Sequence, residues 1–174
     1  MILETPRLKL RPLRLSDADD LYDCCKDPAV GPSAGWKPHE SIEETREIMQ
    51  AVFLDREGIF GMELGENGRI VGSVGLMPDP KRENPLARMI GYSLGRPYWG
   101  RGLMTEAVRR VLDYGWEELS LSLISACCYP ENARSKSVLQ KCGFQYEGTL
   151  RLAEVLYDGR VLDHECYILL NPRR

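Results

Sequence analysis

Apolar and polar residues alternate at positions 8–13 (Leu-Lys-Leu-Arg-Pro-Leu), a spacing that predicts an opening β-strand. Two helices are expected next, at about residues 17–26 and 41–56, because the start of each range resembles a capping box. In the second helix, one face carries the apolar residues Ile48, Met49, Val52 and Phe53. The segment between the helices, residues 28–38, is rich in glycine and proline and predicts a loop.

The rest of the chain predicts six strands and two helices. The strands are expected at residues 59–64, 69–77, 87–94, 122–127, 146–156 and 161–170, and the helices at 104–119 and 132–142. Asn67-Gly68 follows the first of these strands and Asp158-Gly159 precedes the last, and both sequences are typical of hairpin turns. Gly143 stands where the second helix should end, as a C-cap glycine does.

This order of elements, β-α-α-β-β-β-α-β-α-β-β, predicts an α+β fold. We expect a mixed, mostly antiparallel central sheet flanked by helices, and a single domain that spans residues 1–174. The strands at 87–94 and 122–127 stand on either side of one helix, so they should be parallel neighbours. They must splay apart if a ligand enters between them.

Composition narrows the class of protein. The chain has 174 residues, of which 43% are hydrophobic and 28% charged, as in an ordinary soluble globular domain. It contains no run of 18 apolar residues and its first residues lack a signal-peptide pattern, so we expect a cytoplasmic protein without a membrane partner. The net charge of −3 argues against nonspecific nucleic-acid binding, which needs a basic surface.

The cysteines and histidines predict no metal site. The six cysteines include no C-x-x-C spacing, and we interpret them as reduced core residues: Cys24, Cys25, Cys127, Cys128, Cys142 and Cys166. His39 and His164 are far apart in sequence and have no cysteine or histidine at ligand spacing.

Candidate chemistry gathers between the strand at 87–94 and the helix at 104–119, in the sequence Tyr-Trp-Gly-Arg-Gly-Leu-Met-Thr-Glu-Ala (98–107). Glycines let backbone N–H groups approach an anion, and the positive end of the helix would point at the same anion. A plain turn is the alternative interpretation of this segment alone. The P-loop motif is absent, and the dinucleotide fingerprint fails because Thr105 stands where its third glycine belongs.

Four segments together resemble the GNAT (Gcn5-related) N-acetyltransferase superfamily, and most closely its RimJ/RimL-like branch of ribosomal-protein N-acetyltransferases. The glycine loop is similar to that branch's Y-W-G-[KR]-G-x-[AM]-T-E-A segment. Residues 131–144 are similar to its E-N-x-x-S-x-x-V-L-x-K-x-G-F segment. The opening residues 3–13 and the closing residues 148–167 match as well, so the likeness covers nearly the whole chain.

The resemblance implies acetyl-CoA as the co-substrate, bound in the splay. Backbone groups of Tyr92, Ser93 and Leu94 would pair with its pantetheine arm as an added strand does. The pyrophosphate would lie on the loop residues Trp99, Gly100, Arg101, Gly102, Leu103, Met104 and Thr105. Arg101 is either a phosphate contact or a solvated loop charge. Asn132 either binds the pantetheine arm or caps its own helix.

The resemblance also implies direct attack of a neutral primary amine on the thioester. Ser135 would protonate the departing CoA thiolate, because Leu139 stands where many superfamily members carry a tyrosine; a plain surface serine is the alternative. Glu63 is the candidate base, although a surface position fits its strand better. Tyr129 is a proton donor or a wall of the site.

Two residues are candidates for acceptor binding. Trp36, in the loop at 28–38, either packs on the acceptor or covers the core, and Asp163 is a candidate partner for an ammonium group. The acceptor itself stays open between a protein N-terminus and a small amine, as does a monomer or a homodimer. A non-catalytic acyl-CoA-binding or regulatory module on the same fold is the competing hypothesis, and the intact Asn132 and Ser135 favour the enzyme.

Overall fold

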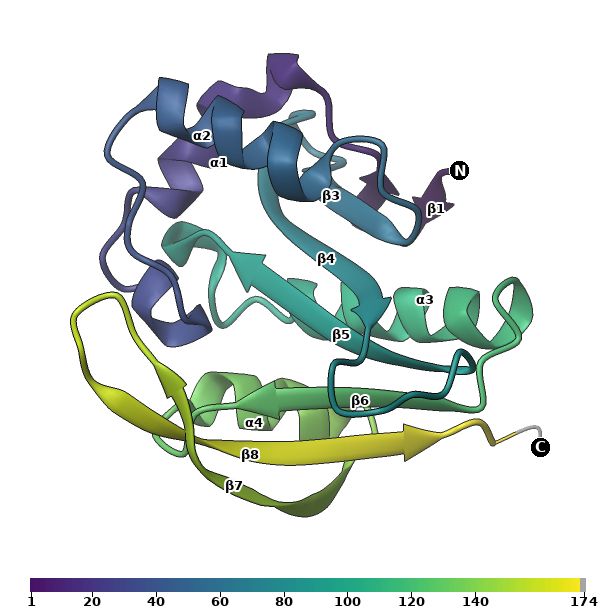
Figure 1. The fold of residues 1–174 in the computed structure, drawn as a ribbon. Helices are drawn as coiled ribbons and strands as arrows, with labels where there is room; N and C mark the ends of the chain where they lie inside the picture. The colour runs from purple at the N-terminus through teal and green to yellow at the C-terminus, as the bar shows by residue number, and fades with distance from the viewer. Residues whose placement is uncertain (173–174) are drawn as a thin grey trace.

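The structure of the protein is a computed structural model that describes residues 1–172 (Figure 1). Across these residues one sheet has the strand order β1-β2-β3-β4-β5-β6-β8-β7. The strands are β1 Leu3–Glu4, β2 Leu8–Arg11, β3 Ile59–Leu64, β4 Ile70–Pro78, β5 Ala87–Leu94, β6 Leu123–Cys128, β7 Gln145–Val155 and β8 Val161–Leu170. The α-helices are α1 Ala18–Cys25, α2 Ile42–Ile48, α3 Leu103–Glu117 and α4 Ala133–Lys141.

The sheet has the mixed character that the element order predicts. Strands β5 and β6 are parallel, and the other neighbouring strands pair antiparallel. The crossover between the parallel pair is α3, as expected for two parallel strands that are neighbours in one sheet. The α+β fold class is therefore confirmed.

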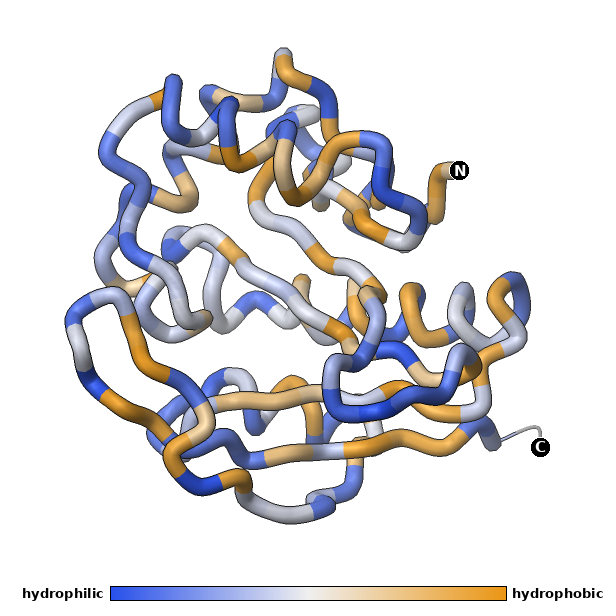
Figure 2. Tube along the Cα trace, in the orientation of Figure 1, coloured by the Kyte–Doolittle hydropathy of each residue, from blue (hydrophilic) through white to orange (hydrophobic). Residues whose placement is uncertain are grey.

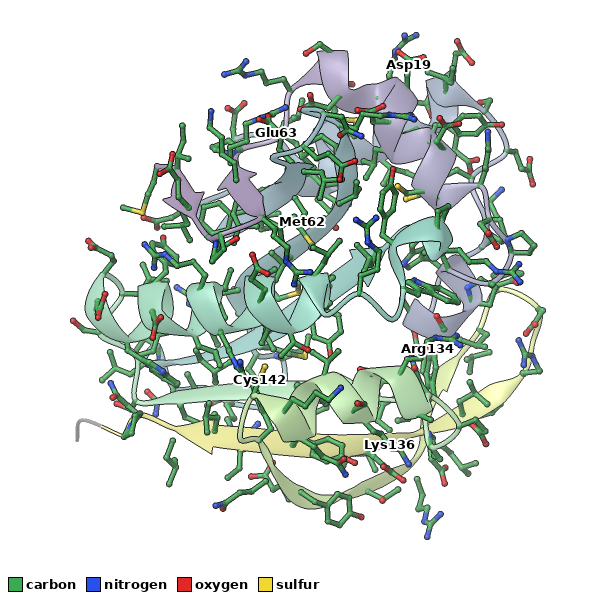
Figure 3. All side chains as sticks on the ribbon, turned by 180° about the vertical axis from the view of Figure 1, so that it is seen from behind. Asp19, Met62, Glu63, Arg134, Lys136 and Cys142 are labelled. Carbon is green, nitrogen blue, oxygen red and sulfur yellow. The ribbon has the colours of Figure 1, made fainter. Side chains whose placement is uncertain are left out.

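Helices α3 and α4 cover one face of the sheet, which is hidden in Figure 1 and turned toward the viewer in Figure 3. The inner side of α3 supplies Ala107, Val108 and Val111, each with 0% of its surface exposed. These residues belong to the same apolar cluster as Val74 of β4 and Ile90 of β5. Burying this stripe fixes the beginning of α3 beside the end of β5, which positions the glycine loop.

A second apolar cluster joins α1 and the α2 region to the start of β4 through Leu21, Met49 and Ile70. The predicted helix at 41–56 is wrong in its second half. Helix α2 ends at Ile48, and residues 49–53 form a π-helical turn in which the Leu54 N–H donates to the Met49 carbonyl, five residues back. The wider turn rotates the expected apolar face, so Met49 is buried and Val52 is 48% exposed.

The start of α1 also differs from its prediction. A capping box at Ser16 was expected, but residues 15–17 form a short 3-10 turn. The Asp17 carboxylate accepts the Arg14 N–H (2.8 Å) and two N–H groups of Arg11 (2.8 Å each). The acidic side chain therefore anchors the chain before α1 to strand β2, six residues earlier, a contact that the expected capping box does not indicate.

The connection between β4 and β5, residues 79–86, is strongly hydrophilic (Figure 2) and crosses in front of β6 in Figure 1. Beneath it, Cys127 of β6 is only half-buried, as is Cys142 after α4. The prediction that all six cysteines are core residues is therefore wrong for these two. None of the helices in residues 1–172 has the length and apolar character that a membrane crossing needs.

Candidate functional site

The parallel strands β5 and β6 pair only at their beginnings. Ala87, Arg88 and Met89 align with Leu123, Ile124 and Ser125. Beyond Met89 the two strands diverge, as Figure 1 shows, and the remainder of β5 pairs only with β4. The splay expected from the sequence is present, and it opens toward the glycine loop and the beginning of α4.

Alternation along β5 decides which backbone groups face the splay. The N–H of Gly95 donates to the Val71 carbonyl at 2.8 Å. Every second residue of β5, counted back from Gly95, therefore directs its backbone N–H and C=O at β4. Ser93 is one of them, and its hydroxyl lies 3.2 Å from that of Ser73 on β4. The backbone groups of Tyr92 and Leu94 point the other way, into the splay.

The loop between β5 and α3 is built around two glycines with left-handed backbone. Gly100 has φ +73° and Gly102 has φ +76°, values that side-chain-bearing residues rarely adopt. A Cβ added at Gly100 would meet no atom within 4 Å, so the loop presents open backbone there. Such a surface fits a bulky anion that needs close approach to N–H groups.

Helix α3 begins at this loop. Its first N–H groups, at residues 103–105, have no acceptor within the helix, and the first helical bond runs from the Glu106 N–H to the Gly102 carbonyl (3.1 Å). Leu103 and Met104 turn their side chains into the core, where they are 1% and 6% exposed. Met104 therefore contributes its N–H at the helix end without placing bulk over the loop.

Three cationic or aromatic side chains surround the loop. The Trp99 indole N–H donates to the Leu94 carbonyl (2.7 Å), which holds the ring beside the splay. The Arg134 guanidinium, at the start of α4, lies 3.9 Å from the centre of that ring. Arg101 extends toward Glu66 on the neighbouring hairpin, with 3.9 Å between Nη2 and Oε2. One positive charge thus stacks on Trp99, the residue before Gly100, and another belongs to Arg101, the residue after it.

Ser135 lies within hydrogen-bond distance of the side chain of Tyr92, a residue that the sequence suggested only for its backbone groups. The Tyr92 hydroxyl is 2.8 Å from Ser135 Oγ, so the two hydroxyls join β5 to the first turn of α4. Burial raises the pKa of Tyr92 above its ordinary value, and the contact with Ser135 offsets this only in part. The phenol therefore stays protonated at neutral pH and can donate.

Asn132 joins α4 to the loop at 28–38. Its Oδ1 accepts the Ser135 N–H (3.0 Å), the N-cap geometry that its residue type favours. Its Nδ2 donates to the Ser33 carbonyl (3.0 Å) in the distant loop. The side chain is thus a helix cap and a tether at once, and its contact with a pantetheine arm stays a prediction.

Tyr129 belongs to a cluster that sequence reasoning missed. Its hydroxyl donates to Glu154 Oε2 (2.6 Å), and His164 Nε2 lies 2.9 Å from the same oxygen. Burial raises the pKa of Tyr129, and the hydrogen bond to Glu154 raises it further. Glu154 carried no sequence signal, because alternation in β7 does not separate it from the exposed charges nearby.

The loop at residues 28–38 covers this cluster. Gly35 has φ +91°, and a Cβ there would lie 2.8 Å from both Glu154 Oε1 and the Tyr129 hydroxyl. Trp36 packs beside His39, with 5.2 Å between ring centres, and against the second apolar cluster. The loop expected to form an acceptor site therefore does reach Tyr129, through Gly35.

Two predicted residues lie elsewhere. Glu63 on β3 forms an ion pair with Arg11, which also holds Asp17, and Figure 3 shows it far from Arg134 and Lys136 on α4. Asp163 accepts the Leu152 N–H (2.8 Å) and binds Arg151 (2.7 Å), so it supports an irregular turn of β7 in which Leu152 has φ +49°. The structure brings neither carboxylate to the splay.

Comparisons with known proteins agree with this geometry. Residues 7–145 match the family model of the acetyltransferase (GNAT) domain. The chain is 38% identical over 173 residues to the uncharacterized N-acetyltransferase p20 of Bacillus licheniformis, covering 97% of this chain and 95% of that protein. It is 32% identical over 177 residues to the uncharacterized N-acetyltransferase YoaA of Bacillus subtilis, covering 99% of this chain and 98% of that protein.

One further relative and one solved structure are also similar to this chain. The chain is 35% identical over 83 residues to the [ribosomal protein uS5]-alanine N-acetyltransferase of Escherichia coli, covering 48% of this chain and 42% of that one. The microcin C7 self-immunity acetyltransferase MccE, solved with acetyl-CoA and AMP, superposes with a TM-score of 0.80 at 22% identity, covering 96% and 94%.

A GNAT-family acetyltransferase of Bacillus anthracis superposes with a TM-score of 0.86 at 24% identity, over 98% of both chains.

In residues 1–172 no group of three or more acidic, histidine or cysteine side chains is placed to hold a metal ion. The open glycine loop at the end of a splayed parallel pair fits a CoA pyrophosphate and arm. The chain therefore belongs to the GNAT family and is an acetyl-CoA-dependent N-acetyltransferase.

Proposed function

We propose that this enzyme transfers the acetyl group of acetyl-CoA directly to a primary amine within a ternary complex. The observation that carries the proposal is the Tyr92–Ser135 hydroxyl pair, 2.8 Å apart, on the splay that the glycine loop borders. A donor group at this point has a use in thioester chemistry, where a thiolate must leave.

The donor half of the site rests on backbone groups. The first N–H groups of α3 and the open backbone at Gly100 hold the pyrophosphate, and Arg101 and Arg134 offset its charge. The backbone groups of Tyr92 and Leu94 pair with the pantetheine amides. Ser93 contributes no backbone bond in this arrangement, because its groups face β4.

The departing sulfur receives a proton from Ser135. Tyr92 donates in turn to Ser135 Oγ, so two hydroxyls share the transfer. The N–H of Tyr92 or Leu94 stabilises the oxyanion that forms when the amine attacks the carbonyl carbon. Leu139 has no proton to donate and is fully buried in the core.

Glu154, which the sequence did not suggest, replaces Glu63 as the proposed base. Its carboxylate is held by Tyr129 and His164, and its second oxygen faces Gly35 in the acceptor loop. An ammonium group that binds there can lose its proton to the carboxylate before attack. Tyr129 then acts as a positioning residue for Glu154, and Trp36 as a wall of the loop.

We propose a protein N-terminus as the acceptor, with small amines as the second candidate. The proposal is supported by partial identity to a ribosomal-protein alanine N-acetyltransferase and not by any bound acceptor. The same relative supports a cytoplasmic location. The single domain at 1–174 and the choice between a monomer and a homodimer stay predictions.

The test is calorimetric titration with acetyl-CoA, followed by a thiol-release assay over peptides with free N-termini, polyamines and amine antibiotics. Binding with release on one acceptor supports the transferase and names its class. Binding without release on any acceptor favours the non-catalytic acyl-CoA module, and no binding contradicts the assignment of the glycine loop.

A further inference from the structure

Two thiols face each other across neighbouring strands on the side of the sheet away from α4. Cys127 of β6 and Cys166 of β8 are aligned partners in the antiparallel register. Their sulfur atoms are 3.5 Å apart. Neither residue takes part in the acetyl-transfer site as proposed above.

The register places this pair where a disulfide fits. The Asn171 N–H donates to the Ser122 carbonyl (2.9 Å), so the even-numbered residues of β6 bond to β8 and Cys127 does not. Cys127 and Cys166 are therefore a non-hydrogen-bonded pair, for which Cα atoms lie roughly 4.5 Å apart. Disulfides span Cα separations of about 4.4–6.8 Å, so a bond can form without moving the strands apart.

A cation lies beside one of the two sulfurs. Lys81, in the hydrophilic connection between β4 and β5, is 3.1 Å from Cys127 Sγ through its Nζ. A neighbouring ammonium stabilises negative charge on sulfur and makes it a better nucleophile. Burial raises the pKa of the Cys166 thiol to about 11, so Cys166 stays protonated at neutral pH. The two sulfurs thus have different roles available to them.

We propose that Cys127 and Cys166 form a reversible oxidative modification site, in which a hydroperoxide converts the dithiol to a cross-strand disulfide. The Cys127 thiolate attacks one peroxide oxygen, the O–O bond breaks, and a sulfenic acid and hydroxide form. Cys166 sulfur then attacks the Cys127 sulfur and water leaves with the Cys166 proton. The sum is two thiols plus hydrogen peroxide giving one disulfide and two waters.

The other cysteines lack this combination. Burial raises the pKa of Cys24 to about 11, of Cys25 to about 12 and of Cys128 to about 11. Cys142 is half-buried like Cys127, but its sulfur lies 3.8 Å from the Thr105 carbonyl. Oxidation by limiting peroxide should therefore be selective for the Cys127–Cys166 pair.

The first test uses the unaltered protein and needs no activity. The reduced protein is treated with about one equivalent of hydrogen peroxide, denatured, alkylated and weighed by mass spectrometry. We expect six alkylated cysteines before treatment and two fewer afterwards. Dithiothreitol should restore the original six. Peptide mapping should place the new bond between residues 127 and 166.

Variants separate the two roles. Cys166→Ser should stop at a sulfenic acid on Cys127 that dimedone traps, and Lys81→Gln should slow disulfide formation at least about threefold. Cys142→Ser is the matched control and should oxidise like the unaltered protein. A disulfide that still forms in Cys127→Ser, or oxidation spread evenly over the cysteines, would overturn the proposal, as would full retention of six free thiols in the unaltered protein.

Discussion

Arg7 and Glu106 join the beginning of the chain to the first turn of α3. Arg7 Nη2 lies 2.6 Å from Glu106 Oε2, and the Arg7 backbone N–H donates to Oε1 at 2.9 Å. The same guanidinium donates through Nη1 to the Arg101 carbonyl (2.8 Å), inside the glycine loop. One side chain therefore holds both the loop and the helix end that we propose to bind the pyrophosphate.

Arg7→Gln should raise KM for acetyl-CoA roughly fivefold, as expected for a loss of about 1 kcal/mol from a partly exposed contact. Acetyl-pantetheine has no pyrophosphate, so its kcat/KM should stay unchanged. Arg46→Gln, which removes an exposed arginine paired with Glu43, is the control. Equal losses with both donors would mean that Arg7 supports the fold rather than the loop.

Gly102→Glu should abolish acetyl-CoA binding in calorimetry, because it adds bulk and negative charge at the proposed anion site. Gly68→Glu is a matched control: its φ of +72° is close to the +76° of Gly102, and a Cβ there meets no atom within 4 Å. Both variants carry the same backbone strain, about 1 kcal/mol. Unchanged affinity in Gly102→Glu would contradict the phosphate-loop assignment.

Ser135→Ala should lower kcat while acetyl-CoA affinity stays nearly intact, because the lost hydroxyl acts on the departing thiolate. Tyr92→Phe should lower kcat less, since Ser135 still donates. In the double variant the effects should not add, because the two hydroxyls act as one pair. Turnover at the normal rate in Ser135→Ala would remove it as the acid.

Glu154→Gln should lower kcat/KM for the amine by about 100-fold at pH 7, the usual scale for loss of a general base. The deficit should shrink as pH rises, because an α-amine loses its own proton near pH 8 and no longer needs a base. Glu43→Gln, at an exposed residue paired with Arg46, is the control. A deficit that stays constant with pH would indicate a structural role for Glu154.

Asp17→Asn should lower the free energy of unfolding by about 2 kcal/mol at pH 7, because it removes charged hydrogen bonds to Arg11 and leaves that side chain paired with Glu63 alone. Burial raises the pKa of Asp17, but the hydrogen bonds from Arg11 and Arg14 outweigh it and the net pKa is lowered. The unaltered protein should therefore lose stability as pH falls from about 4, where Asp17 of the unfolded chain takes up a proton, through the lower pKa of Asp17 in the folded protein. The variant should lack that part of the loss in urea titrations.

The sequence predicted the strands and the splay well because their signals are local. Alternation, Asn-Gly and Asp-Gly turns, and the helix between two apolar strands each act within a few residues. The prediction failed at residues 49–53, where burial of Met49 produces a π-turn instead of a continued α-helix. It also failed at Ser16, because Arg11 of β2 binds the Asp17 carboxylate and residues 15–17 form a 3-10 turn instead of the expected cap.

The residues of the candidate site also differ in how far the sequence could place them. The glycine loop, Asn132 and Ser135 lie in short contiguous motifs, so their positions follow from the sequence. The Tyr129–Glu154–His164 cluster joins the residue after β6 to both strands of the β7–β8 hairpin, and the pairing of β6 with β8 brings the three side chains together. The same holds for Glu63, the residue suggested as the base. Strand pairing places it beside Arg11 of β2, an ion pair that its own strand does not indicate.

The Asn132 tether has a thermodynamic consequence. One amide side chain bonds the beginning of α4, beside the donor half of the site, and the Ser33 carbonyl in the loop over the acceptor half. A movement of α4 on acetyl-CoA binding would therefore also change the position of that loop, which couples the two binding equilibria. By linkage the exchange is reciprocal: the factor by which acetyl-CoA changes acceptor affinity equals the factor by which the acceptor changes the affinity for acetyl-CoA.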